Sequence, residues 1–218
     1  MINPSEYFSK GYYAGNITEL TTDTTTFKQQ VDVLRTNLAA PHLKWSMVQG
    51  VFGHPEFSHL TPSEEVETRK KMVSDNGYRI TQQWGQLETP IDTNYFGNLL
   101  YEFGYKIYSQ LTPECTYGFG QITSYKAGDL IEYHTDGQNP GRLFAGLIYL
   151  SDPYENGGGE IDIWETPYTI QDPDITVSPK YGNFVLIDFT KNNPGHAVRI
   201  VKDNFHRLCY LNFVSNTR

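Results

Sequence analysis

The sequence of 218 residues has few cysteines and no long apolar run. Its two cysteines, Cys115 and Cys209, lie far apart, which argues against a disulfide framework and makes a reducing compartment the default. No apolar stretch approaches the roughly 20 residues that a bilayer-crossing helix needs. The N-terminus also lacks the charged and apolar regions of a secretory signal. We therefore expect a soluble, cytoplasmic protein that makes no membrane contact.

Positive charge is also scarce. The chain carries 17 Lys and Arg against 25 Asp and Glu, a net charge of −8, and no dense basic cluster. This balance argues against a protein that lies along phosphate backbones, so we expect no nucleic-acid partner. With 38% apolar residues the chain can bury a substantial core, and we expect residues 1–218 to form a single domain. The sequence leaves the oligomeric state open.

The N-terminal half has helical periodicity in places. Residues 1–26 are polar and are interpreted as irregular or strand-like, whereas Phe27, Val31, Leu34 and Leu38 recur at helical spacing and predict a helix over 27–40. Residues 41–60 are interpreted as loop. Further helices are predicted at 61–75, where Pro and acidic residues occupy the first turn, and at 95–111. We expect residues 1–112 to be mainly helical.

After Pro113 the sequence consists of short apolar runs separated by turn residues. This pattern is typical of a β-sandwich or β-barrel. The predicted fold is α+β: a double-stranded β-helix, or jelly-roll, core at residues 113–218 with an N-terminal layer of packing helices. The strand at 143–150 is apolar on both faces, so it should lie in the centre of a sheet. The predicted strands span residues 117–125, 130–135, 143–150, 160–164, 175–177, 183–189, 197–201 and 207–214.

His134 and Asp136 are the centre of the chemical signal. They lie two positions apart at the end of an alternating run, so their side chains share one face of a strand. With His196 as the second imidazole they form a 2-His-1-carboxylate set, which suits Fe(II) because it leaves coordination positions open. Arg207, on the last strand, supplies a fixed cation for an organic acid. A lone His-x-Asp arises by chance in roughly one such sequence in four, so the interpretation depends on the whole ordered set.

The ordered set resembles a known family. Residues 117–214 resemble the 2-oxoglutarate/Fe(II)-dependent dioxygenase superfamily and are most similar to its prolyl 4-hydroxylase-like branch, which includes the oxygen-sensing prolyl hydroxylases. The first 110 residues carry no comparable motif. The matching stretches are Ser124-Tyr125-Lys126-Ala127-Gly128, His134-Thr135-Asp136, Leu147-Ile148-Tyr149-Leu150-Ser151, Gly158-Gly159-Glu160-Ile161, Asn193-Pro194-Gly195-His196-Ala197-Val198 and Arg207-Leu208-Cys209-Tyr210-Leu211-Asn212.

The resemblance implies a role for each matching residue and a set of cofactors. Arg207 and Tyr149 would hold the distal carboxylate of 2-oxoglutarate, and Tyr125 would lie near its metal-chelating end. The spacing from His196 to Arg207 is longer than in the branch, so Arg199 remains an alternative anchor. The cofactors are Fe(II) and the co-substrate 2-oxoglutarate, with O2 consumed and ascorbate a further candidate cofactor. The implied iron ligands are His134, Asp136 and His196.

The resemblance also implies the reaction. It is hydroxylation of a C–H bond with release of succinate and CO2, and an intact Asp136 favours hydroxylation over halogenation. A prolyl residue in a peptide or protein is the expected substrate, and a free amino acid or small metabolite is the alternative. Nucleic-acid demethylation is disfavoured because Phe213 stands where the repair relatives have a second arginine. A rival of another class is a non-catalytic, metal-holding jelly-roll that binds a partner through Trp45, Trp84 and Trp164.

Overall fold

The computed structural model describes most of the chain. Outside it lie the predicted helix at 61–75 and the first part of the predicted strand at 117–125. All six stretches that carry the resemblance lie within the described residues. The described residues are 3–50, 82–88, 91–108, 120–136, 141–152, 157–166, 172–190, 192–202 and 207–215.

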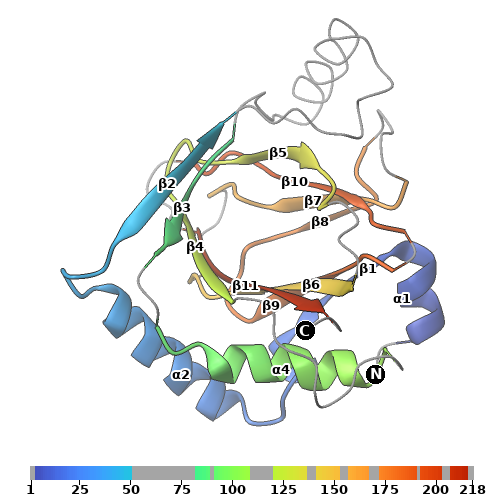
Figure 1. The fold of residues 1–218 in the computed structure, drawn as a ribbon, viewed down its shortest axis with the longest axis horizontal. Coiled ribbons are helices and arrows are strands. Elements are labelled where there is room, and N and C mark those ends of the chain that lie inside the picture. Colours follow the sequence, from blue (N-terminus) through green and yellow to red (C-terminus); the bar gives the residue numbers. More distant parts are fainter. Residues whose placement is uncertain are drawn as a thin grey trace, which may run out of the picture.

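Two antiparallel sheets face each other in the described part of the chain (Figure 1). The larger has seven strands in the order β1-β9-β6-β11-β4-β3-β2, and the smaller has four in the order β5-β10-β7-β8. This is the jelly-roll arrangement predicted from the sequence. The larger sheet contains β1 (Tyr12–Asn16), β2 (Trp45–Gly50), β3 (Gln82–Leu87), β4 (Gln121–Tyr125), β6 (Arg142–Tyr149), β9 (Asn183–Asp188) and β11 (Arg207–Ser215). The smaller contains β5 (Ile131–His134), β7 (Ile161–Trp164), β8 (Ile175–Val177) and β10 (Gly195–Val198).

Helices α2 (Thr24–Leu38) and α4 (Asn94–Tyr105) lie under the outer face of the larger sheet, as the predicted helical layer should (Figure 1). Helix α2 begins at Asp23, whose side chain accepts a hydrogen bond from Thr26 N at 2.9 Å. Helix α1 (Pro4–Lys10) and a 3-10 turn, η1 (Ile17–Glu19), flank β1. None of the helices in the described part of the chain combines the length and apolar character that crossing a bilayer requires.

Three strands come from the part of the chain that was expected to be mainly helical. The prediction of loop at 41–60 is wrong over β2, which pairs with β3 from Trp45 opposite Leu87. Neither sequence alternates regularly between apolar and polar residues, so β2 and β3 form strands by pairing with each other, and β3 also pairs with β4. The interpretation of 1–26 as irregular or strand-like is right at β1 but misses α1. The helix predicted at 95–111 ends at Tyr105, just after Gly104.

The larger sheet separates two apolar cores, and β6 is an interior strand of it, between β9 and β11, as its apolar sequence predicts. One core lies between this sheet and the helices and includes Phe27 and Leu100. The other lies between the two sheets and includes Tyr149 and Cys209. Because side chains alternate along a strand, β6 and β11 contribute to both cores. The predicted site residues belong to the side between the sheets.

Candidate functional site

His134, Asp136 and His196 come together at one end of the smaller sheet. His134 ends β5, and His196 lies directly opposite it on β10. Their ring centroids are 4.2 Å apart. Asp136, two residues beyond the end of β5, places one carboxylate oxygen 3.6 Å from His134 Nε2 and the other 3.5 Å from His196 Nε2. In the described part of the chain, one donor atom from each residue lies within 4.8 Å of the other two.

This donor set fits a divalent metal ion. Two donors about 2.1 Å from one ion and at right angles to each other lie about 3 Å apart, close to the spacing seen here. Two imidazoles and one carboxylate on one side of an ion leave its other positions open, which is the set that suits non-haem Fe(II). His196 Nδ1 lies 3.4 Å from the Pro194 carbonyl oxygen. That contact leaves Nε2 to face Asp136, as metal-bound imidazoles commonly require.

The electrostatics of the three residues favour an ionised carboxylate. Burial by itself would raise the pKa of the Asp136 carboxyl, but His196, His134 and Arg142 together hold it at about 2. Asp136 is therefore negatively charged at neutral pH and is ready to bind a cation without first losing a proton. Arg142 opens β6 and was not identified from the sequence, because its effect depends on proximity in space.

Gly195 positions the backbone of His196. A Cβ atom built at Gly195 would overlap the phenol of Tyr133, whose ring also packs edge-on against Trp164. Only a residue without a side chain lets β10 lie this close to Tyr133 on β5. The Pro194-Gly195 sequence before His196 thus has a packing reason as well as a place in the matching motif.

Arg207 is buried in the core between the sheets, and no charged partner for it lies among the described residues. Its exposed fraction is 1%, and among the described residues its Nε and Nη1 have no hydrogen-bond partner. Nη2 donates to Tyr149 Oη over a long 3.4 Å. A buried guanidinium that lacks an anion is costly, and pairing with a carboxylate offsets that cost. The donors of Arg207 that have no partner among the described residues can bind the carboxylate of an organic acid.

Tyr125 and Tyr149 flank the Arg207 side chain. The guanidinium carbon lies 4.3 Å from the ring centroid of Tyr125 and 5.0 Å from that of Tyr149. Burial raises the pKa of both tyrosines, although the charge of Arg207 opposes the shift. Both hydroxyls are therefore protonated at neutral pH and can donate to a carboxylate. The ring of Tyr125 meets the Arg207 end of the pocket, and its contact with the metal-chelating end stays a prediction.

Arg199, the alternative anchor, is engaged elsewhere. Its Nε and Nη2 donate to the two carboxylate oxygens of Asp162 at 2.7 and 3.1 Å. Asp162 is fully buried, and Thr176 contacts the same pair. An arginine held by both oxygens of a buried carboxylate has little capacity for a second acid. This pairing favours Arg207 as the anchor.

Gly159 provides the space for Arg207. Its φ is +73°, and a Cβ atom there would lie 2.9 Å from Arg207 Cδ and 3.1 Å from Val201 Cγ2. The Gly158-Gly159-Glu160-Ile161 stretch that carries part of the resemblance therefore lies directly against Arg207. Cys209 is also buried at this end of the pocket and was not assigned a role. Burial raises the pKa of its thiol, so it is present as the neutral form.

Comparison with known proteins confirms the resemblance and the fold. Residues 120–215 match the family model described as the 2OG-Fe(II) oxygenase superfamily, whereas no curated protein matches the sequence. Among similar solved structures, an oxidoreductase of the 2OG-Fe(II) oxygenase family from Burkholderia pseudomallei has a TM-score of 0.61 at 16% identity, over 100% of this chain and 92% of that one. A prolyl hydroxylase from Trichoplax adhaerens, solved with a hypoxia inducible factor peptide fragment, has a TM-score of 0.57 at 13% identity, over 98% and 87%.

Proposed function

We propose, from the match of residues 120–215 to the 2OG-Fe(II) oxygenase superfamily, that this chain is an Fe(II)- and 2-oxoglutarate-dependent hydroxylase. The observation that carries the proposal is the buried guanidinium of Arg207, which has unpartnered donors among the described residues. Arg207 lies against Tyr125 and Tyr149 of the inter-sheet core, and His196 shares a face of β10 with Val198 of the same core. A metal site and an acid site on the facing inner surfaces of the two sheets are what a chelating keto acid requires.

The chain's residues would hold the reactants in the following way. His134, Asp136 and His196 bind the metal through two neutral imidazoles and one carboxylate. Arg207 and Tyr149 bind the distal carboxylate of 2-oxoglutarate and so fix the direction of its keto-acid end. Bound Fe(II) would couple decarboxylation of 2-oxoglutarate, with O2, to hydroxylation of a C–H bond and release of succinate and CO2. Apolar side chains of the inter-sheet core, such as Ile163 and Val198, exclude water from the pocket.

The expected substrate is a prolyl residue in a peptide or protein. The support is the resemblance of the motifs to the prolyl hydroxylase branch and the fold shared with the Trichoplax prolyl hydroxylase, which binds a peptide. A free amino acid or small metabolite is the alternative, and a prolyl peptide is the first substrate to test. Ascorbate remains a prediction, to be tested by adding it to the assay.

The non-catalytic alternative has weak support from the aromatic residues assigned to it. Trp164 is fully buried and packs against Tyr133, so it cannot grip a partner. Trp45 is 37% exposed, and the side chain of Trp84 lies outside the described residues. A binding module also gives no reason for the buried donors of Arg207 that have no partner among the described residues, whereas Arg199 is paired with Asp162.

Two measurements on the full chain test the proposal. Anaerobic addition of Fe(II) and 2-oxoglutarate should produce a weak visible metal-to-ligand charge-transfer band, and subsequent O2 should release succinate. Incubation with a proline-rich peptide library should give a gain of about 16 Da, one oxygen atom, by mass spectrometry. The Asp136→Ala variant is the control and should give neither result. If the unmodified protein gives neither band nor succinate, it is a binding module. Succinate without a modified peptide would direct the search to small molecules.

A further inference from the structure

The hydrogen-bond ladder between β6 and β11 changes just beyond the end of β6. The register places Cys209 opposite Tyr149, so Leu208 falls opposite Leu150, and Leu150 N donates to Leu208 O at 2.9 Å. A regular antiparallel pair of this kind also has the reciprocal bond, from Leu208 N to Leu150 O. Here Leu208 N instead donates to Ser151 Oγ at 2.5 Å, and the same hydroxyl lies 3.3 Å from Leu208 O. A side-chain hydroxyl thus replaces a backbone carbonyl.

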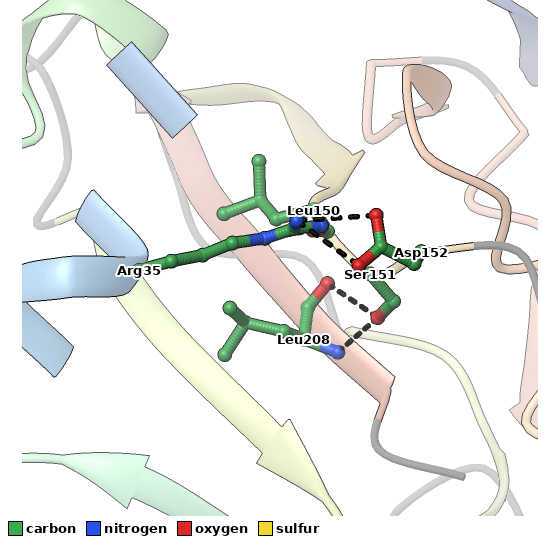
Figure 2. A network of polar contacts seen from close by, with 5 residues as sticks. All are labelled: Arg35, Leu150, Ser151, Asp152 and Leu208. Carbon is green, nitrogen blue, oxygen red and sulfur yellow. Dashed lines mark hydrogen bonds and ion pairs between the residues drawn. The ribbon is translucent and has the colours of Figure 1, made fainter. Parts of the chain in front are cut away.

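The carbonyl of Leu150 binds Arg35 of α2 (Figure 2). Arg35 Nε donates to Leu150 O at 3.0 Å, and Nη2 donates to the same oxygen. Nη1 lies 3.1 and 3.2 Å from the two carboxylate oxygens of Asp152. The Asp152 side chain is 81% exposed, so this ion pair contributes little. The contact to the part-buried carbonyl is therefore the stronger of the two polar links that Arg35 makes from α2.

We name Arg35, Leu150, Ser151 and Leu208 the bracket. Its two backbone members directly follow the two residues assigned to the carboxylate of 2-oxoglutarate, because Leu150 follows Tyr149 and Leu208 follows Arg207. The bracket fixes the separation of these two main-chain segments from the outer face of the sheet. The contact between Tyr149 Oη and Arg207 Nη2 is already long, at 3.4 Å, so a small shift of either strand would break it.

We propose that Arg35 and Ser151 are positioning residues for the co-substrate, which they do not touch. They hold Tyr149 and Arg207 at the spacing that grips one carboxylate. The inference rests on the proposed function, since it names residues that tune the same pocket. Helix α2, which belongs to the part of the chain without a family motif, thereby sets the affinity for 2-oxoglutarate.

Ser151→Ala is the first test. The change leaves Leu208 N–H without its acceptor while Arg35 still occupies the Leu150 carbonyl, so the two segments must shift to satisfy the buried group. We expect the Kd for 2-oxoglutarate to rise about tenfold, less than the about hundredfold that a 1 Å misplacement can cost. Calorimetric titration into protein loaded with Mn(II), which does not turn over, measures this Kd. The affinity for Mn(II) itself should stay unchanged.

Arg35→Lys gives a second, independent variant. Lysine keeps the charge but lacks the planar fork that places two donors on one carbonyl oxygen. The KM for 2-oxoglutarate should rise in both variants while kcat at saturating 2-oxoglutarate changes less than about twofold, because the metal site is untouched. Ser151→Thr retains the hydroxyl and should restore most of the affinity.

Two control variants separate positioning from general stability. Asp152→Ala removes the exposed partner of Arg35 but keeps the carbonyl contact, and should leave the Kd unchanged. Asp23→Ala removes the N-cap of α2, and should lower the Tm without changing the Kd. If Asp23→Ala weakens 2-oxoglutarate binding as much as the bracket variants do, the effect is one of stability and the inference is wrong.

The outcomes distinguish this inference from the proposed function. Absence of 2-oxoglutarate binding by the unmodified, Mn(II)-loaded protein would reject the proposed function. Tight binding by the unmodified protein, with unchanged Kd values in Ser151→Ala and Arg35→Lys, would reject only the role of the bracket. If Ser151→Ala does not fold, the Kd of Arg35→Lys decides the question. Arg35 reaches the sheet from the surface of α2, so its replacement should not prevent folding.

Discussion

At the scale of single residues, the partly exposed metal ligands contribute little to the stability of the fold, whereas the burial of the Arg207 charge opposes it. His134 and Asp136 are partly exposed at the end of β5, so they are not part of the packed core. Arg207 is almost completely buried and carries a charge without a carboxylate partner in the described chain. Replacing His134 or Asp136 should therefore change the free energy of unfolding little. Arg207 can remain buried only because an anion or the surrounding aromatic rings offset the burial of its charge.

Replacement of His134 or Asp136 by Ala should abolish metal binding and turnover and leave the fold intact. Each variant loses one of three metal donors but little packing, so the free energy of unfolding should change by less than about 1 kcal/mol. Calorimetry with Mn(II) and urea denaturation check the two parts. Global unfolding of either variant would contradict the placement of these ligands outside the core.

Arg207→Ala and Arg199→Ala should give contrasting results. Loss of Arg207 should weaken 2-oxoglutarate binding by about 2–5 kcal/mol, the usual cost of removing one partner of a buried charged contact. Loss of Arg199 removes the cationic partner of the buried Asp162 carboxylate and should lower stability by about 1–3 kcal/mol without changing that affinity. Calorimetric titration and urea denaturation of both variants provide the comparison. The reverse pattern would identify Arg199 as the anchor.

At the scale of elements, the turn before β7 lies against Arg207 of β11 through Gly159. Gly159→Ala should weaken 2-oxoglutarate binding, because its Cβ would lie 2.9 Å from Arg207 Cδ and push that side chain away. Gly128 has a similar positive φ of +89°, but a Cβ atom added there would meet nothing within 4 Å, so Gly128→Ala is a matched control. Both changes should cost about 1–2 kcal/mol of stability for the left-handed backbone. Only Gly159→Ala should change the Kd, and equal Kd values would exclude the steric explanation.

Elements with a strong local pattern were predicted well. Helix α2 and β8 fall at or near their predicted bounds because apolar spacing in the sequence reports directly on the buried face. Strands β2 and β3 were not predicted, since their sequences lack a regular apolar alternation and become strands through pairing. The types and order of the site residues were evident from the motifs. The contact of Gly159 with Arg207, and the Ser151 hydroxyl in place of a carbonyl, depend on the packed structure and left no signal in the sequence.

At the scale of the whole molecule, the larger sheet divides the protein into a layer that stabilises the fold and a layer that contains the site. Leu100 on α4 is fully buried and lies against Gly146 of β6, where even an added methyl group would collide with it. This close contact joins the helical layer to the centre of the sheet. The site lies on the opposite face of the same strand.

Leu100→Ala should therefore destabilise the protein without weakening its affinity for 2-oxoglutarate. Removal of a fully buried leucine side chain costs about 2–5 kcal/mol because a cavity remains. Val33 lies on α2 and is 55% exposed, so Val33→Ala should lower the free energy of unfolding by less than about 0.5 kcal/mol. Urea denaturation measures the difference. A large rise in the Kd for Leu100→Ala, measured below the unfolding transition, would show that the two layers are coupled more strongly than this arrangement implies.

The side chains of β11 point alternately toward the two cores, and this alternation has a practical consequence for engineering the protein. Positions 207, 209, 211 and 213 face the pocket side, and positions 208, 210, 212 and 214 face the helices or their surroundings. A library that varies only the odd-numbered positions could explore new keto acids while the even-numbered positions preserve folding. A directed-evolution experiment on this chain could in that way change chemistry and thermostability along one nine-residue segment as nearly independent traits.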